Sequence, residues 1–443
     1  MLQSFSNVFK IPELKRRLLF TMAMLAIYRI GAHVPTPGIN TLALASFIKS
    51  AAKGTIFGFF DMFSGGAFSN LTIFTLGIMP YISASIILQL LAVVVPYLER
   101  LSKEGEQGRR KITQYTRYGT VVLSVIQSLG IAIGLESMEG GMFVRSPGWA
   151  FRIMTVITLT AGTAFIMWIG EQISERGIGN GISLIISAGI VAGLPGALLN
   201  SYDQIRTGDM KFYVLLAIIA IMFIVVAGVV LMQQSQRRIP VQYPKRVVGR
   251  RIMGGQSTHV PLRINTAGVI PVIFASSIIM FPLTVIKFLR NSLESDVWRG
   301  VFDAIEQNMM PGAVMYTVVY VILIVFFCYF YTAIIFNPTD LAENMKKNGG
   351  FIPGIRPGKR TADFIDRALT RVTLAGAIFL SAISVLPTFL IRWFNVPFYF
   401  GGTALLIVVG VGLDTIQQME SHLVMRHYEG FLRGSKRIRG RRS

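Results

Sequence analysis

The sequence is short of charged residues for its length and has almost no cysteine. Of its 443 residues, 15% are charged and 52% are hydrophobic, whereas a soluble globular domain carries roughly 25% charged residues. The mean hydropathy is +0.57. This deficit of charge excludes an ordinary soluble domain and indicates an integral membrane protein.

Motifs for metal binding and catalysis are also missing from the sequence. The single cysteine, Cys328, lies in an apolar run, so a disulfide and a thiolate metal site are excluded. The four histidines form neither an HExxH motif nor a ligand cluster, and a glycine-containing stretch around Lys359 lacks the spacing of a phosphate-binding loop. We therefore expect a protein that is not an enzyme and needs no cofactor.

Acidic residues are absent from the middle of every predicted membrane span, since Glu171 and Asp414 fall at span ends. Carriers driven by protons or sodium ions commonly use such carboxylates, so their absence argues against that class. A multispan solute carrier with inverted repeats stays open as an alternative to a channel. A membrane-embedded scaffold that conducts nothing is the other alternative.

What is present is a series of ten apolar stretches. Each has about 17 to 23 residues, the length at which a helix crosses a hydrocarbon core of ~30 Å. The predicted spans are 18–34, 73–95, 118–135, 153–170, 181–199, 212–232, 266–286, 314–336, 372–391 and 397–413. The sequence therefore predicts an all-α integral membrane protein with ten transmembrane helices.

The basic residues predict the orientation of these helices. The net charge is +21, and 30 of the 43 Lys and Arg residues lie in the N-terminal segment, the C-terminal tail and alternate loops, against 9 in the remaining loops. By the positive-inside rule, both termini are then cytoplasmic, and anionic lipids are expected partners. The first span should be retained as an anchor, because Arg29 and the following HVPTPG replace a signal-peptide cleavage site.

The stretch from Asp61 to Glu99 contains 37 consecutive uncharged residues, too many for one span. Its first part, 62–71 (MFSGGAFSNL), is small, broken by glycine and only half apolar. Such a segment can lie at membrane depth only inside protein or beside a water-filled cavity. We expect a short re-entrant or plugging element that makes few deep contacts and is easily displaced, followed by a spanning helix.

The second and seventh spans share an internal repeat. GIMPYISASII at 77–87 matches GVIPVIFASSI at 268–278 at six of eleven positions, and the two spans run in opposite directions. Transporters and channels use inverted halves to build a central pathway, although these residue types are common in membrane helices and could match by chance. Ile78 and Ile82 share a helix face, Ile273 takes the position of Ile82, and Ile182 and Ile186 form another such face. Either core packing or a pore lining would explain these isoleucines.

Two long cytoplasmic loops, 233–265 and 337–369, are rich in basic residues. The first loop carries Arg and Lys in pairs and has a strand-like composition with Gly and Pro breaks. Membrane topology alone would explain the positive charge. Paired arginines also suit docking to an acidic partner, either protein carboxylates or RNA phosphates.

Several long motifs occur in order along nearly the whole chain, including MFSGGAFSNLTIFTLGIMPYISASII, QYTRYGT, GEQISERGIGNGIS, NTAGVIPVIFASSI and FNPTDLAENMKKNGGFIPGIRPG. By these motifs the sequence resembles the SecY family, the channel subunits of bacterial protein-secretion translocons. The resemblance implies two inverted, pseudo-symmetric halves around a central hourglass pore in the bacterial inner membrane. The implied boundaries are a cytoplasmic N-terminus at 1–17, halves at 18–200 and 201–417, a basic tail at 418–443 and a plug at about 55–70.

The resemblance also implies functional residues. A pore ring is expected at Ile78, Ile82, Ile182, Ile186, Ile273 and Ile407. The core of the plug is expected at Met62, Phe63, Ser64, Gly65 and Gly66. A lateral gate for signal sequences is expected at Ser83, Gln127, Asn265 and Phe281, and docking contacts at Lys245, Arg250, Arg251 and Arg356.

The implied partners are the small membrane subunits SecE and SecG, the motor ATPase SecA, the ribosome including its RNA, and the signal sequences of preproteins. YidC and SecDF are further expected partners. The arginine-rich end of the chain, GFLRGSKRIRGRRS, departs from the family pattern and receives no role.

Overall fold

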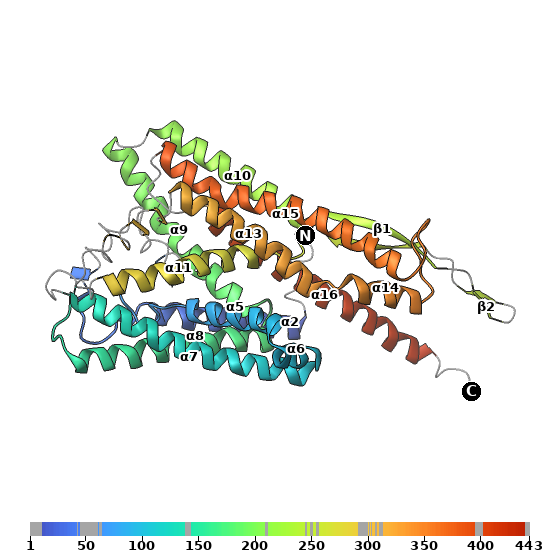
Figure 1. Ribbon diagram of the computed structural model, residues 1–443, viewed down its shortest axis with the longest axis horizontal. Helices are drawn as coiled ribbons and strands as arrows, with labels where there is room; N and C mark the ends of the chain where they lie inside the picture. Colours follow the sequence, from blue (N-terminus) through green and yellow to red (C-terminus); the bar gives the residue numbers. More distant parts are fainter. Residues whose placement is uncertain are drawn as a thin grey trace.

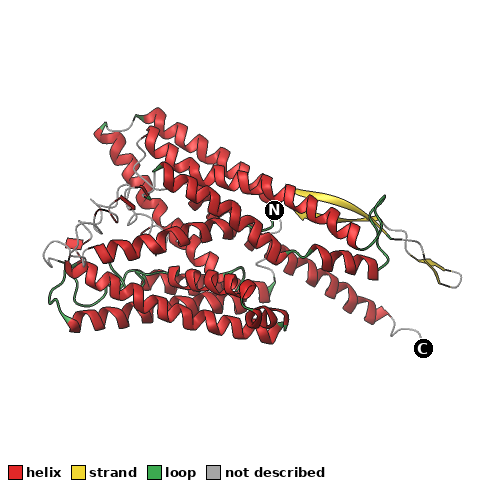
Figure 2. Cartoon of the chain, viewed as in Figure 1, coloured by secondary structure: helices red, strands yellow, loops and turns green. Residues whose placement is uncertain are grey.

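Long helices make up most of the protein in a computed structural model of the chain (Figures 1 and 2). The structure describes residues 11–41, 43–44, 61, 64–137, 143–208, 211–243, 246–248, 251–253, 257–290, 300, 302, 304–305, 308–309, 313–394 and 402–438. The helices of the first half are α2 (Pro12–Gly31), α5 (Met79–Val94), α6 (Pro96–Lys103), α7 (Glu106–Ser137), α8 (Trp149–Arg176) and α9 (Gly181–Thr207). Those of the second half are α10 (Phe212–Gln234), α11 (Ile270–Arg290), α13 (Val314–Ile335), α14 (Pro338–Lys347), α15 (Lys359–Phe394) and α16 (Gly402–Ile438).

Apart from α6 and α14, each of these helices overlaps one predicted span, which is consistent with ten crossings. By length and apolar composition alone, six of the described helices could cross a membrane, or seven if the bent pair α5 and α6 is one span. Several helices run past the predicted spans into the flanking loops. As a result, the predicted boundaries at 200 and 417 fall inside α9 and α16.

The start of the second span was predicted wrongly. Helix α5 begins at Met79 and not at residue 73, and the chain before it forms a series of turns. Two residues with positive φ, Leu71 at 40° and Gly77 at 55°, prevent a helix from running through this stretch. The end of the span agrees with the sequence, because Pro96 starts α6 after a bend of 100°.

The internal repeat has the same backbone form in both halves. Gly77 and Gly268 both have left-handed φ values, of 55° and 64°. In each copy the helix begins two residues later, with Pro80 or Pro271 as its second residue. A proline fits the first turn of a helix because the amide hydrogen that it lacks would have no partner there. The equal construction of the two helix starts supports a true repeat over a chance match.

The two halves pack against each other through three helix pairs. Helix α11 of the second half packs on α5 and α7 of the first, and α16 of the second half packs on α9 of the first. Within the halves, α7 lies between α5 and α8, and α13 lies between α11 and α15. In Figure 1, α5 leads toward the end of the molecule where α6 lies, and α11 starts from that same end, so the repeated helices run in opposite directions.

The two basic loops that the sequence predicts to be cytoplasmic form a small folded unit at that end of the molecule (Figure 1). Strands β1 (Gln236–Gln242) and β4 (Ser257–Arg263) pair antiparallel, as do β2 (Arg246–Val248) and β3 (Arg251–Met253), so the strand-like composition is confirmed. Gln242 exchanges two backbone hydrogen bonds of 2.9 and 3.0 Å with Phe351, which joins the two long loops. A shared core of Ile239, Val241, Leu262, Met345, Ile352, Ile365, Ala368 and Leu369 lies beneath them.

Candidate functional site

The six predicted ring isoleucines come together in one hydrophobic cluster that spans both halves. Five of them are at most 5% exposed, and Ile182 is partly buried against the same cluster. They belong to four different elements: the start of α5, and helices α9, α11 and α16. The cluster also contains Ala67, a residue of the predicted plug.

The four helices that carry these isoleucines form two contacting pairs, and each pair joins the two halves. Helix α5 packs on α11, and α9 packs on α16. A ring around a central axis needs contributions from both sides of that axis, and this pairing supplies them. The side chains are branched and aliphatic, so they present no charge and no hydrogen-bonding group.

The described part of the predicted plug is packed more deeply than the sequence predicts. Ser64 and Ala67 are 3% and 0% exposed, and Phe68 lies in a second core cluster with Leu71 and Leu76. Met62 and Phe63 lie outside the described residues. The expectation of few deep contacts is therefore wrong for residues 64–68, because small side chains let this segment enter narrow space between helices.

Hydrogen bonds fix the shape of the described part of the predicted plug, residues 61 and 64–70, which we call the plug segment. Asp61 accepts from the Ser69 backbone N–H at 2.7 Å through its carboxylate and from the Gly66 N–H at 2.9 Å through its carbonyl. The Ser64 hydroxyl accepts from the Phe68 N–H at 3.1 Å. These local bonds replace the helical ladder that the glycines and turns interrupt.

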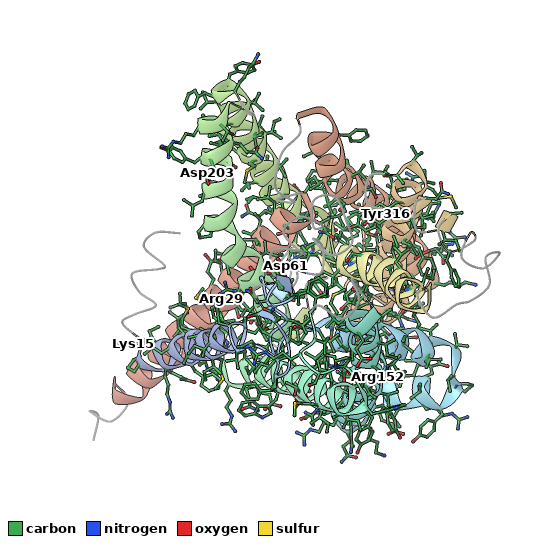
Figure 3. The ribbon with its side chains drawn as sticks, turned by 90° about the vertical axis from the view of Figure 1, so that its left-hand side faces the viewer. Lys15, Arg29, Asp61, Arg152, Asp203 and Tyr316 are labelled. Atoms are coloured by element: carbon green, nitrogen blue, oxygen red, sulfur yellow. The ribbon has the colours of Figure 1, made fainter. Side chains whose placement is uncertain are left out.

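Helix α2 and helix α9 both contact the plug segment. The Tyr28 hydroxyl donates to the Ser64 carbonyl at 3.2 Å, and the Arg29 Nη1 donates to the Gly65 carbonyl at 2.5 Å. A Cβ atom added to Gly65 would lie 2.8 Å from the Cα of Gly189 on α9 and 3.3 Å from Arg29 Nη1. Figure 3 shows Arg29 and Asp61 near each other toward the middle of the molecule.

The sequence contained two signals for these contacts that did not lead to the plug. Arg29 interrupts the first span, and from the sequence its charge indicates only a retained anchor. Gly189 and Gly193 have the spacing of a helix-packing motif, and Gly193 has open space around a Cβ position. Gly189 instead meets the plug, whereas Gly181 does make a close helix contact, with the Gly170 carbonyl of α8.

The predicted gate residues lie on or beside three neighbouring helices. Ser83 is buried on α5, Gln127 is half-buried on α7, and Phe281 belongs to α11, which packs on both. Asn265 stands before α11, and its side-chain amide donates to the Gly268 carbonyl at 3.0 Å. The structure therefore brings the elements of the predicted gate together and gives Asn265 a local role in shaping the start of α11.

Two of the four predicted docking residues, Lys245 and Arg250, lie outside the described residues. Arg251 is in β3, and Arg356 is exposed in the loop that follows the bridge to Gln242. The structure adds Arg237 and Arg238, which are exposed on β1 of the same unit. Their occurrence as an adjacent arginine pair in the sequence could have identified them as docking candidates.

Comparison with known proteins shows what kind of chain this is. The family model for SecY matches residues 72–416. The chain belongs to the SecY family. The protein translocase subunit SecY of Escherichia coli (strain K12) is 52% identical over 422 residues, which are 95% of this chain and 94% of that protein. The corresponding subunit of Aquifex aeolicus (strain VF5) is 47% identical over 437 residues, 98% of this chain and all of that protein.

Solved structures in the same comparison share the fold. A protein-conducting channel aligns with a TM-score of 0.64 at 19% identity, covering 94% of this chain and 96% of the other. Sec61 in a canine ribosome-channel complex from the endoplasmic reticulum aligns with a TM-score of 0.61 at 18% identity, with the same coverage. The all-α multispan architecture expected from the sequence is thereby confirmed as the fold of the SecY and Sec61 channels.

Proposed function

We propose that this protein is the protein-conducting channel subunit of a bacterial translocon. It passes unfolded preproteins across the inner membrane and releases apolar segments sideways into lipid. The observation that carries the proposal is the collection of six isoleucines from four helices, paired across the two halves, next to a packed plug segment. An apolar constriction excludes water and ions by dewetting and does not bind the varied side chains of its substrate.

The lateral opening in this proposal lies where α5 and α7 meet α11. These helices belong to different halves, so separation of the halves along this line would open the pathway to lipid. Ser83 on α5 and Gln127 on α7 belong to one side of this line, Phe281 belongs to α11 on the other, and the Asn265 side chain bonds to the turn before α11. A signal sequence, which is itself an apolar helix, would replace the helix contacts that are lost there.

The energy for transport would come from partners that bind the cytoplasmic unit. The basic residues Arg237, Arg238, Arg251 and Arg356 stand on one folded unit, at the same end of the molecule as α6 and α14 (Figure 1). Arginine pairs well with carboxylates and phosphates. We infer that this unit takes SecA or the ribosome and its RNA, with both chain termini on the same, cytoplasmic side.

The remaining partners follow from the apolar outer surface and from family membership. SecE and SecG are proposed to cover part of the exposed apolar faces. Anionic lipids are proposed to pair with the basic loops. YidC and SecDF are proposed to act with the channel on chains that are being inserted or that emerge from it. Exposed apolar side chains such as Phe223, Ile224 and Ile322 show that the outer helices α10 and α13 face a non-aqueous surrounding.

Transport by the reconstituted protein tests the proposal. The chain, with SecE and SecG, is placed in liposomes, and SecA, ATP and an unfolded precursor are added. Protease-protected precursor is expected only when SecA and ATP are both present. Uptake of a small solute without any motor would favour the carrier alternative, and absence of both activities with active SecA would favour the scaffold.

A further inference from the structure

Arg29 is a charged residue inside the first membrane helix, α2, and the proposed channel gives it no task. It stands in the last turn of α2 and is half-buried. Charged side chains within membrane helices are costly and usually point to a partner in the protein interior. The partner here is the carbonyl of Gly65, to which the Arg29 guanidinium donates at 2.5 Å.

The neighbouring residue on α2 makes a second bond to the same segment. The Tyr28 ring is 1% exposed and stacks on Phe74 with ring centroids 5.9 Å apart. Its hydroxyl donates to the Ser64 carbonyl at 3.2 Å. Two consecutive residues of α2 therefore hold two consecutive carbonyls of the plug segment.

The chemistry of these bonds suits a segment that must be both held and released. Gly65 lies in a turn, and the Ser64 carbonyl also accepts a hydrogen bond of 3.4 Å from the Ala67 N–H. The donors on α2 add to the bonds that this irregular backbone makes locally. A hydrogen bond from a charged donor is stronger than one between neutral groups. At the same time, the bonds from Tyr28 and Arg29 are hydrogen bonds from side chains, which can break and form again.

Helix α9 adds a close contact at the same residue. A Cβ atom added to Gly65 would lie only 2.8 Å from the Gly189 Cα of α9 and 3.3 Å from Arg29 Nη1. Gly65 is therefore held both by a hydrogen bond from α2 and by close packing on α9. Displacement of the segment from this place requires the bonds to Tyr28 and Arg29 to break.

We propose that Arg29 is a positioning residue that latches the plug segment in its resting place, with Tyr28 as the second donor. This inference rests on the proposed channel function, because the latch matters only if the segment closes a pathway. Removing the Arg29 donor should raise the population of the displaced segment roughly tenfold. This factor corresponds to the free energy of a hydrogen bond to a charged group.

The test measures the accessibility of a buried plug residue. Ala67 is 0% exposed, so Ala67→Cys in a Cys328→Ala background gives one thiol that reacts with a water-soluble maleimide only when the segment moves. The full chain, with its membrane partners, is labelled in lipid nanodiscs, where both sides are open to reagent. Arg29→Gln should react roughly tenfold faster than the parent, Tyr28→Phe moderately faster, and Arg29→Lys close to the parent because a lysine can still donate.

The matched control is Arg206→Gln, which removes an exposed arginine near the end of α9. It should leave the labelling rate unchanged. Equal rates for the parent and Arg29→Gln would overturn the latch, as would an increase of the same size in Arg206→Gln. If Arg29→Gln unfolds on heating much earlier than the parent, Tyr28→Phe decides, because it keeps the ring and its stacking on Phe74.

These measurements test the proposed latch and the proposed channel function independently of each other. Labelling reports the position of the segment whether or not anything is conducted, and precursor uptake reports conduction. Faster labelling of Arg29→Gln in a protein that never takes up precursor would leave the latch standing and remove the proposed function. Normal uptake with unchanged labelling would remove only the latch.

Discussion

Gly65 and Gly189 touch so closely that a Cβ atom on Gly65 would lie 2.8 Å from the Cα of Gly189. The two residues are far apart in the sequence, one in the plug segment and the other in the middle of α9. Gly65 also has a φ of 66°, in the region that favours glycine. This contact places the predicted plug segment against a helix that carries two isoleucines of the predicted ring, Ile182 and Ile186.

The first prediction separates this contact from backbone strain. Gly66 has a φ of 86° but open space around a Cβ position, whereas Gly65 has both a positive φ and the close neighbour. Gly65→Ala should therefore raise the resting ion conductance in planar bilayers clearly more than Gly66→Ala does. Equal conductance in the two variants would show that the contact with Gly189 does not seat the segment.

Much of the fold could be predicted from the sequence because the membrane imposes simple rules. Lengths of apolar stretches gave the spans, and the pairing of 77–87 with 268–278 pointed to two related halves. The contact between Gly65 and Gly189 could not be predicted in this way. A small residue on a helix allows close approach of any backbone. The four-residue spacing between two small residues does not reveal whether the partner is another helix or a turn.

The start of α5 shows a second limit of sequence reasoning. Residues 73–78 are apolar enough to continue a helix, so composition extended the span to them. The backbone at Leu71 and Gly77 turns there instead, and the hydroxyl groups of Thr72 and Thr75 bond to nearby backbone within the turn. Local hydrogen bonds of this kind compete with a helix and leave little trace in hydropathy.

The second prediction concerns docking at the cytoplasmic unit. Arg356 is exposed beside the bridge between Gln242 and Phe351, so Arg356→Glu should weaken binding of SecA or ribosomes without affecting membrane insertion. Reversal of a charge in a bidentate pair costs about 2–5 kcal/mol of binding free energy. Affinity of the purified protein for each partner measures this effect, and Arg206→Glu serves as the control. Unchanged affinity in Arg356→Glu would remove this residue from the docking surface.

The third prediction concerns the ion pair between Arg117 on α7 and Glu171 on α8. The guanidinium makes two contacts of 2.8 Å with the carboxylate, and Glu171 is only 15% exposed whereas Arg117 is 46% exposed. The pair joins α7 to α8. Because solvent screens the arginine, its coupling energy should be about 0.5–1 kcal/mol.

Thermal melts of the single variants Arg117→Gln and Glu171→Gln and of the double variant measure this coupling. Each single change should lower the melting temperature, and the double change should cost less than the sum of the two. Strictly additive losses would mean that the pair contributes nothing measurable to the association of α7 with α8.

The last prediction concerns the seal made by Ile78, Ile82, Ile182, Ile186, Ile273 and Ile407. Burial in one cluster is compatible with core packing as well as with a pore ring, so the two roles must be separated by their consequences. Ile→Asn at two of these positions should wet the constriction and raise the resting ion conductance, whereas Ile→Val should leave it nearly unchanged. If the isoleucines only pack the core, truncation should instead destabilise the protein by about 0.5–1.5 kcal/mol per Ile→Val change, and conductance should not respond.

Single-channel recording in planar bilayers, together with thermal melts of the same variants, decides between the two roles, since a lowered melting temperature with unchanged conductance would contradict the seal.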